Sequence, residues 1–172
     1  MGLKPTDIDN KETRRVSDRT STMANTFSQC FYHLVFSTKE RVKFIRPDIE
    51  DRVWAYVGGI AKNHKMTAVQ VGGIEDHLHA LVMAKPKWAP SNIAQLLKGE
   101  SSKWIHEEFP KLSKFGWQDG YAVFTVSKSI VPKVVAYIRD QRSHHATKTF
   151  EEEYAELLQL HGVDYDERFL LG

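Results

Sequence analysis

The sequence predicts an α+β fold of ferredoxin-like order, βαββαβ, with an antiparallel sheet, helices on one face and further helices toward the C-terminus. Four short segments are rich in aromatic and β-branched residues, which is typical of strands. Two segments between them repeat apolar residues at helical spacing. A pair of glycines and an aspartate separate the second strand from the third, as in a hairpin.

The first predicted strand is Phe27–Ser37, which is followed by the charged stretch Thr38–Lys43. The first predicted helix begins near Pro47, because a proline ring suits the first helical turn. The acidic residues Asp48 and Glu50 favour the positive N-terminal end of this helix. Its apolar face is expected to contain Ile49, Val53, Val57 and Ile60.

The second and third predicted strands are Thr67–Val71 and His77–Met83. We expect the segment from Gly72–Gly73 to Asp76 to form the turn between them. The two strands would then pair as an antiparallel hairpin.

The remaining elements follow from similar signals. Ser91 is expected to cap a helix that runs towards Phe109. Tyr121–Val126 is the fourth predicted strand. Ser129–His144 is predicted to be helical, with Pro132 near its start, and Phe150–Leu160 is predicted as a further, acidic helix.

Length and composition indicate one domain. Of the 172 residues, the first 22 are polar, so we expect residues 1–25 to form a flexible tail and residues 26–172 to form the domain. The single cysteine, Cys30, excludes an intramolecular disulfide and fits a cytoplasmic protein. No segment is apolar enough to cross a bilayer, and no secretory signal is evident, so no membrane partner is expected. The net charge of +2 is too small to indicate a nucleic-acid partner unless the positive charge is local.

The segment EDHLHALVM carries the first chemical signal. Side chains alternate between the faces of a strand, so His77 and His79 should point the same way and Leu78 the opposite way. Two adjacent imidazoles can chelate one metal ion, and Asp76 could orient one of them. The spacing alone leaves open a second interpretation, two surface histidines on an edge strand. A metal site would also need a third ligand.

The segment VVAYIRDQRSHH supplies a candidate ligand and a candidate nucleophile. Tyr137 and Gln141 are four residues apart and should share one face of a helix. The Gln141 carbonyl oxygen is a hard ligand that suits Mg²⁺ or Mn²⁺, and the Tyr137 phenol could act as a covalent nucleophile. Taken in isolation, Tyr137 is also consistent with a half-buried helix residue whose hydroxyl faces water.

These segments together resemble the single-tyrosine HUH transposases of small bacterial insertion sequences, the TnpA type. The resemblance covers residues from about Thr26 to about His161. Its motifs, in family order, are FYHLVFSTKER, GGIEDHLHALV, LKGESSKWI, GYAVFTVSKS and VVAYIRDQRSHHATKTFEEEY. The Gln141–Arg142 pair favours the mobile-element branch over a related group associated with repetitive extragenic palindromes.

The resemblance implies a DNA transposase that cuts and rejoins single-stranded DNA. It implies that His77, His79 and Gln141 hold Mg²⁺ or Mn²⁺, and that Tyr137 becomes linked to a DNA 5′-phosphate and leaves a free 3′-hydroxyl. Members of the family act as homodimers on imperfect hairpins. In some, the tyrosine helix of one subunit completes the active site of the other.

Basic residues that could contact phosphates are distributed along the chain, and aromatic residues could stack on bases. The aromatic candidates are Trp88, Trp104, Trp117 and Phe115. The basic candidates are Lys39, Arg41, Lys85, Lys98, Lys103, Arg139 and Arg142.

Three alternatives remain open at the level of sequence. A domesticated HUH nickase would carry the same residues but would move nothing. A non-catalytic ferredoxin-like nucleic-acid-binding module would not bring Tyr137 close to the two histidines. A metal-dependent phosphodiesterase that uses water would not need Tyr137.

Overall fold

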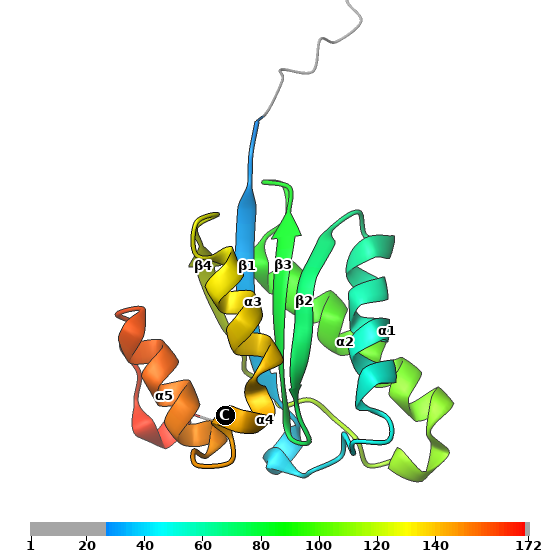
Figure 1. Cartoon of the computed structure of the whole chain (residues 1–172). Helices are drawn as coiled ribbons and strands as arrows, with labels where there is room; N and C mark the ends of the chain where they lie inside the picture. The colour runs from blue at the N-terminus through cyan, green and yellow to red at the C-terminus, as the bar shows by residue number, and fades with distance from the viewer. Residues whose placement is uncertain (1–26, 171–172) are drawn as a thin grey trace, which may run out of the picture.

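The computed structural model describes residues 27–170, so the predicted tail of residues 1–25 lies outside the described part of the chain. Figure 1 shows a sheet with helices packed on both of its faces. The predicted α+β fold is confirmed. The strands are β1 (Cys30–Ser37), β2 (Thr67–Ile74), β3 (His77–Ala84) and β4 (Ala122–Val126).

The four strands form one sheet in the order β2-β3-β1-β4, and each neighbouring pair is antiparallel. This is the sheet order of the predicted ferredoxin-like arrangement. β3 and β1 are therefore the inner strands, and their register pairs Val35 with His79 and Ser37 with His77. His77 and His79, at the start of β3, therefore have β1 on one side and β2 on the other.

One face of the sheet packs against α1 (Glu50–Asn63) and α2 (Pro90–Glu108). The strand residues on this face are apolar and alternate along β1 and β3, as the strand period requires. They include Leu34, Phe36, Leu78, Ala80 and Val82, which join the main core cluster. This layer provides the bulk of the core and leaves the other face for the C-terminal helices.

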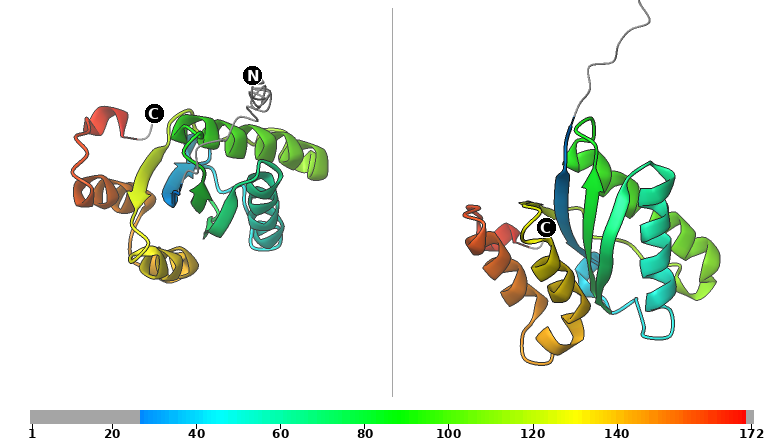
Figure 2. Two further views of the ribbon diagram at one scale, coloured as in Figure 1. Left: turned by 90° about the horizontal axis from the view of Figure 1, so that it is seen from above. Right: turned by 45° about the horizontal axis from the view of Figure 1, so that its top comes forward.

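The opposite face carries α3 (Val131–Arg139), and the left view of Figure 2 shows α3 and α2 on opposite sides of the sheet. α4 (Gln141–His144) follows, and α5 (Phe150–Leu160) lies beside α3. Val131 and Ile138 of α3 pack on strand residues of this face, whereas α5 packs with Phe150, Leu157 and Leu158 on a cluster near β4. Short 3-10 turns occur at Lys39–Arg41, Pro110–Leu112 and Glu167–Phe169.

The predicted continuous helix over Ser129–His144 is wrong in one respect. Asp140 has φ −95° and ψ 19°, outside the helical region, and it separates α3 from α4. The nucleophile candidate and the candidate ligand Gln141 therefore lie on two short helices. The predicted α5 has the same bounds in the structure as in the sequence prediction.

Several predicted boundaries also differ, and two of them have a clear physical cause. Gly72 and Gly73 belong to β2, and the hairpin turn is formed by Glu75 and Asp76. The glycines are needed in the strand because a Cβ on Gly72 would lie 2.8 Å from the Ile138 carbonyl oxygen, and one on Gly73 would lie 2.2 Å from the His77 carbonyl oxygen. α2 begins at Pro90 without a side-chain cap, so Ser91 is not the N-cap: the fixed φ of proline starts this helix instead.

Candidate active site

His77 and His79 lie on β3 and point to the face that carries α3 and α5. Both are fully buried, at 0% exposure, and Leu78 between them joins the core on the other face. β3 is an inner strand. The interpretation of the two residues as surface histidines on an edge strand is therefore wrong, and their predicted alternation is confirmed.

Each of the two imidazoles uses its Nδ1 atom for a hydrogen bond. His77 Nδ1 lies 2.7 Å from Asp76 Oδ1, and His79 Nδ1 lies 3.0 Å from His33 Nε2. In the tautomer that donates the Nδ1–H hydrogen bond to this carboxylate, Nε2 carries the lone pair that a metal ion would use. Asp76 therefore contacts His77 directly, as its predicted role in orienting that ring requires.

His79 Nε2 is buried and has no hydrogen-bond partner among residues 27–170. Burial lowers the pKa of His79, and burial next to His79 lowers the pKa of His33 to about 3, so both rings are neutral at physiological pH. A neutral imidazole with an available nitrogen lone pair can bind a divalent metal ion.

Gln141 and Glu153 bring oxygen atoms to the same place. Gln141 Oε1 lies 2.8 Å from His77 Nε2, and Gln141 Nε2 donates to Glu153 Oε1 at 2.8 Å. Glu153 Oε2 lies 3.4 Å from His79 Nε2 and 3.6 Å from His77 Nε2. The ligand atoms of His77, His79 and Glu153 all lie within 4.8 Å of one another. Nitrogen and oxygen donors in this arrangement suit a divalent cation.

Tyr137 reaches this cluster from α3. Its ring centroid lies 5.7 Å from that of His79, edge to face, and its hydroxyl donates a hydrogen bond to Glu153 Oε1. Burial and the nearby Glu153 carboxylate raise the pKa of Tyr137 well above its ordinary value. The phenol is therefore held protonated beside the two imidazoles, within a single chain.

The position of Glu153 is fixed by α5. A capping box between Thr149 and Glu152 starts this helix, and the Phe150 ring stacks on the His77 ring with centroids 4.6 Å apart. Burial acts to raise the pKa of Glu153, but hydrogen bonds from His145 and other donors hold it well below its ordinary value. Burial likewise acts to lower the pKa of His145, but the 2.9 Å hydrogen bond to Glu153 raises it. The carboxylate is therefore ionised.

Comparison with known proteins agrees with this geometry. The family described as "Transposase IS200 like" matches residues 26–141, more than half of the chain, and the match includes both histidines, Tyr137 and Gln141. The chain belongs to the IS200-like transposase family. The transposase contains no helix within residues 27–170 with the length and apolar character needed to cross a membrane.

Curated relatives agree on the family. The transposase is 26% identical over 118 residues to the ISDra2 transposase TnpA of Deinococcus radiodurans, covering 66% of this chain and 84% of that protein. It is 29% identical over 124 residues to the transposase for insertion sequence element IS200 of Salmonella typhimurium, covering 69% of this chain and 81% of that protein.

Solved structures share the fold of the transposase. A candidate transposase from Deinococcus radiodurans superposes with a TM-score of 0.57 at 26% identity, over 67% of this chain and 93% of that chain. A REP-associated tyrosine transposase bound to a REP hairpin superposes with a TM-score of 0.53 over 70% of this chain and 72% of that chain. At 10% identity, the second likeness concerns the fold alone.

Sequence reasoning missed three residues of this site. His33 lies in an aromatic strand segment, and only the β1–β3 register brings it to His79. Glu153 is one of three consecutive glutamates, and nothing in the sequence distinguishes it from its neighbours. His145 follows α4, and only the packing of α5 brings it to within hydrogen-bond distance of Glu153.

The predicted phosphate contacts of the transposase are divided between the two faces. Arg41 pairs with Glu151 of α5, Arg139 of α3 donates to Gln70 of β2, and Arg142 of α4 pairs with Glu50 and Glu75. Lys39 is exposed in the 3-10 turn that also contains Arg41. Lys98 and Lys103 lie on α2, across the sheet from the site, and Lys85 follows β3 at the end opposite His77. Lys98 is engaged by the carbonyl oxygens of Asp119 and Gly120.

The predicted stacking aromatics are mostly engaged in packing. Phe115 and Trp117 are core residues with 4% and 8% exposure, so their interpretation as base-stacking platforms is wrong. Trp104 stacks on Tyr56 with ring centroids 4.2 Å apart, and Trp88 packs against the main core. These rings pack in or against the apolar layer under α2. The sequence alone does not distinguish buried aromatic residues of this kind from exposed ones.

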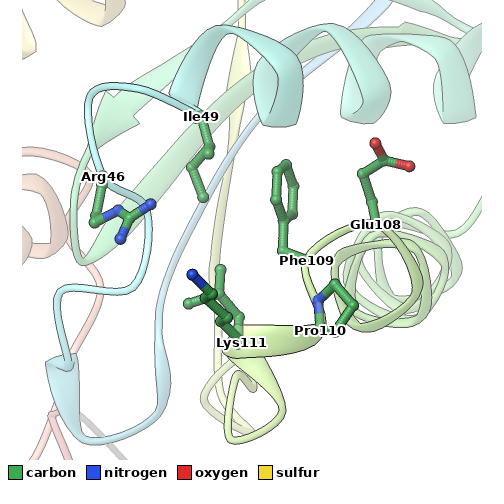
Figure 3. Close-up of a pocket in the computed structure, with 7 residues that line it drawn as sticks. Arg46, Ile49, Glu108, Phe109, Pro110 and Lys111 are labelled. Carbon is green, nitrogen blue, oxygen red and sulfur yellow. The ribbon is translucent and has the colours of Figure 1, made fainter.

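Two hollows lie near these elements. A cavity of about 660 Å³ opens between α3 and α5, and its lining includes His33, Tyr137, Lys133 and Leu160. A smaller hollow of about 220 Å³ lies at the C-terminal end of α2, lined by Arg46, Phe109 and Lys111 among others (Figure 3). None of the predicted site residues lines the smaller hollow, so it is separate from the site.

Proposed function

We propose that this transposase nicks and rejoins single-stranded DNA through a 5′-phosphotyrosine at Tyr137, with Mg²⁺ or Mn²⁺ held by His77, His79 and Gln141. The observation that carries the proposal is the convergence, in one chain, of two imidazole Nε2 atoms, the Gln141 carbonyl oxygen and the Tyr137 hydroxyl. A non-catalytic binding module would have no need for this arrangement.

The residues fit a divalent cation. Within the described part of the chain, His79 Nε2 is a buried nitrogen without a hydrogen-bond partner, and the remaining donors are oxygen or imidazole atoms rather than thiolates. When bound, the ion would polarise a phosphate oxygen and neutralise the charge that develops there. Asp76 and His33 keep the Nε2 lone pairs of the two imidazoles turned towards it.

Tyr137 supplies the nucleophile. Its oxygen attacks the scissile phosphorus, the bond from phosphorus to the 3′ oxygen of the neighbouring nucleotide breaks, and a 5′-phosphotyrosine and a free 3′-hydroxyl result. The number of phosphate ester bonds is unchanged, so a 3′-hydroxyl can reverse the step and rejoin DNA without a nucleotide cofactor. Before attack the Tyr137 hydroxyl donates its hydrogen bond to Glu153. As the new bond forms, the phenol loses this proton and the departing 3′ oxygen gains one to become the hydroxyl, so the protons balance.

The partner in this proposal is a single-stranded DNA with a hairpin, bound by a homodimer. A structural neighbour with the same fold was solved with a REP hairpin bound, and the proposal assigns a ligand of this class to the present transposase. Arg41 contacts α5, Arg139 follows Tyr137 on α3 and Arg142 follows Gln141 on α4. In this proposal these residues, with Lys39 in the same turn as Arg41, would bind phosphates near the scissile one. Lys85, Lys98 and Lys103 would contact more distant parts of the hairpin.

The test uses labelled single strands from the DNA that flanks the gene, including its imperfect palindromes, incubated with the protein and Mn²⁺. We expect a covalent protein–DNA adduct with wild-type protein and none with Tyr137→Phe. Rejoined products with a second labelled strand would support transfer as well as nicking. Cleavage that persists in Tyr137→Phe would contradict the proposal and would favour a phosphodiesterase that uses water.

A further inference from the structure

We propose that Glu153 of α5 is itself a ligand of the metal ion, and that its other carboxylate oxygen tethers the Tyr137 hydroxyl beside that ion. The inference rests on the proposed function in taking the histidine pair as the ion site. It adds a residue that lies beyond the segment matched by the family, which ends at Gln141.

The distances fit a shared ion. Two donor atoms that each lie about 2.1–2.2 Å from one ion are about 3.0–3.6 Å apart when the angle between their bonds is about 90–110°. Glu153 Oε2 lies 3.4 Å from His79 Nε2 and 3.6 Å from His77 Nε2. These separations are those of neighbouring ligands on a common cation.

The charge of Glu153 also fits a bound cation. The side chain of Glu153 is 4% exposed, and a buried carboxylate is costly unless it is paired. Of its neighbours, His145 Nε2 lies 2.9 Å from Glu153 Oε2, and Tyr137 and Gln141 donate neutral hydrogen bonds to Oε1. The ion, in turn, would otherwise be surrounded by neutral imidazole and amide groups. A divalent cation and the Glu153 carboxylate therefore each offset the burial cost of the other.

The second oxygen connects the ion to the nucleophile. Glu153 Oε1 accepts hydrogen bonds from the Tyr137 hydroxyl and from Gln141 Nε2. One carboxylate thus contacts both the proposed ion position and the phenol. α5 cannot shift easily, because Phe150, Leu157 and Leu158 anchor it in a cluster with Val35 and Phe124.

The experiment measures Mn²⁺ binding to the full chain without DNA, by calorimetry and by the electron paramagnetic resonance of free Mn²⁺. Glu153→Gln keeps the size of the side chain and removes its charge, and we expect it to weaken Mn²⁺ affinity by at least about tenfold. The matched control is Glu156→Gln, on the same helix, where the carboxylate is exposed and paired with Lys148. This control should bind Mn²⁺ like the wild type.

If Glu153→Gln does not fold, a second variant, Glu153→Asp, can be used to test Mn²⁺ binding. Glu153→Asp retains the charge but withdraws the carboxylate by one methylene, and its Mn²⁺ affinity should fall as well. Wild-type Mn²⁺ affinity in a folded Glu153→Gln or Glu153→Asp protein would overturn the inference. Because these measurements contain no DNA, they are independent of adduct formation: a protein that binds Mn²⁺ through Glu153 but forms no adduct would refute the proposed function alone.

Discussion

Gly72 of β2 lies so close to Ile138 of α3 that a Cβ at position 72 would lie 2.8 Å from the Ile138 carbonyl oxygen and 2.9 Å from its Cγ2 atom. Ile138 is the residue next to Tyr137, and Gly72 pairs with His79 across the hairpin. The contact therefore sets the distance between the tyrosine helix and the strand of the two histidines.

The first prediction concerns this contact. Gly72→Ala should move α3 away from β2, lower the free energy of unfolding by about 1–3 kcal/mol and reduce adduct formation, because overpacking forces the backbone to shift. Urea denaturation and the adduct assay measure the two effects. Gly59→Ala in α1 is the control: its Cβ would meet nothing within 4 Å, so it should stabilise the protein by up to about 1 kcal/mol. Normal adduct formation by Gly72→Ala would show that the close approach is unimportant.

The second prediction concerns acid stability. The pKa of His33 is lowered by burial from 6.5 to about 3, so the unfolded chain takes up this proton before the folded protein does. The stability that neutral His33 contributes is complete above pH 6.5 and is lost as the pH falls from 6.5 towards 3. In EDTA, wild type should lose about 1 kcal/mol more than His33→Gln between pH 8 and pH 5.5, measured by urea denaturation. Equal losses in both proteins would contradict this assignment.

The third prediction concerns Asp76, whose carboxylate accepts the hydrogen bond of His77 Nδ1. Asp76→Asn keeps an acceptor but removes the charge, and it should weaken Mn²⁺ affinity about tenfold to a hundredfold. Calorimetry without DNA measures this loss. Asp48→Asn removes an exposed carboxylate paired with Arg46 and should leave affinity unchanged. An Asp76→Asn protein with wild-type affinity would mean that the carboxylate does not support the ion site.

The fourth prediction concerns metal and folding together. An ion bound to the folded state alone stabilises it by about 2.7 kcal/mol when its concentration is 100 times the dissociation constant. Mn²⁺ should therefore raise the thermal midpoint of wild-type protein, and EDTA should reverse the rise. His77→Ala and His79→Ala should each lose the rise and all DNA cleavage while still binding the hairpin. Retention of the Mn²⁺ effect in either variant would exclude that histidine as a ligand.

The fold was predictable because each element carries its own periodic signal. The alternation in β3 and the helical spacing in α1 and α5 are local, and local patterns persist in the folded chain. The boundaries that differed depend on contacts between distant segments. Gly72 is required in β2 by Ile138, which lies far along the sequence.

The site was predictable only in part, for the same reason. His77, His79, Tyr137 and Gln141 stand in recognisable local patterns, and the structure brings them together. His33 depends on strand register, and Glu153 depends on how α5 packs after a turn. Strand register and helix packing are tertiary contacts, so these two residues could not be identified from one sequence.

The alternation of side chains between the two faces of β3 restricts insertions and deletions in this part of the gene. Its odd-numbered positions His77 and His79 face the site, and its even-numbered positions Leu78 and Ala80 fill the main core. Loss or gain of one codon within this strand would exchange the two sets, burying imidazoles in the apolar layer and presenting leucine to the ion. Length changes in the family should therefore accumulate in the loops, whereas β3 should stay fixed in length.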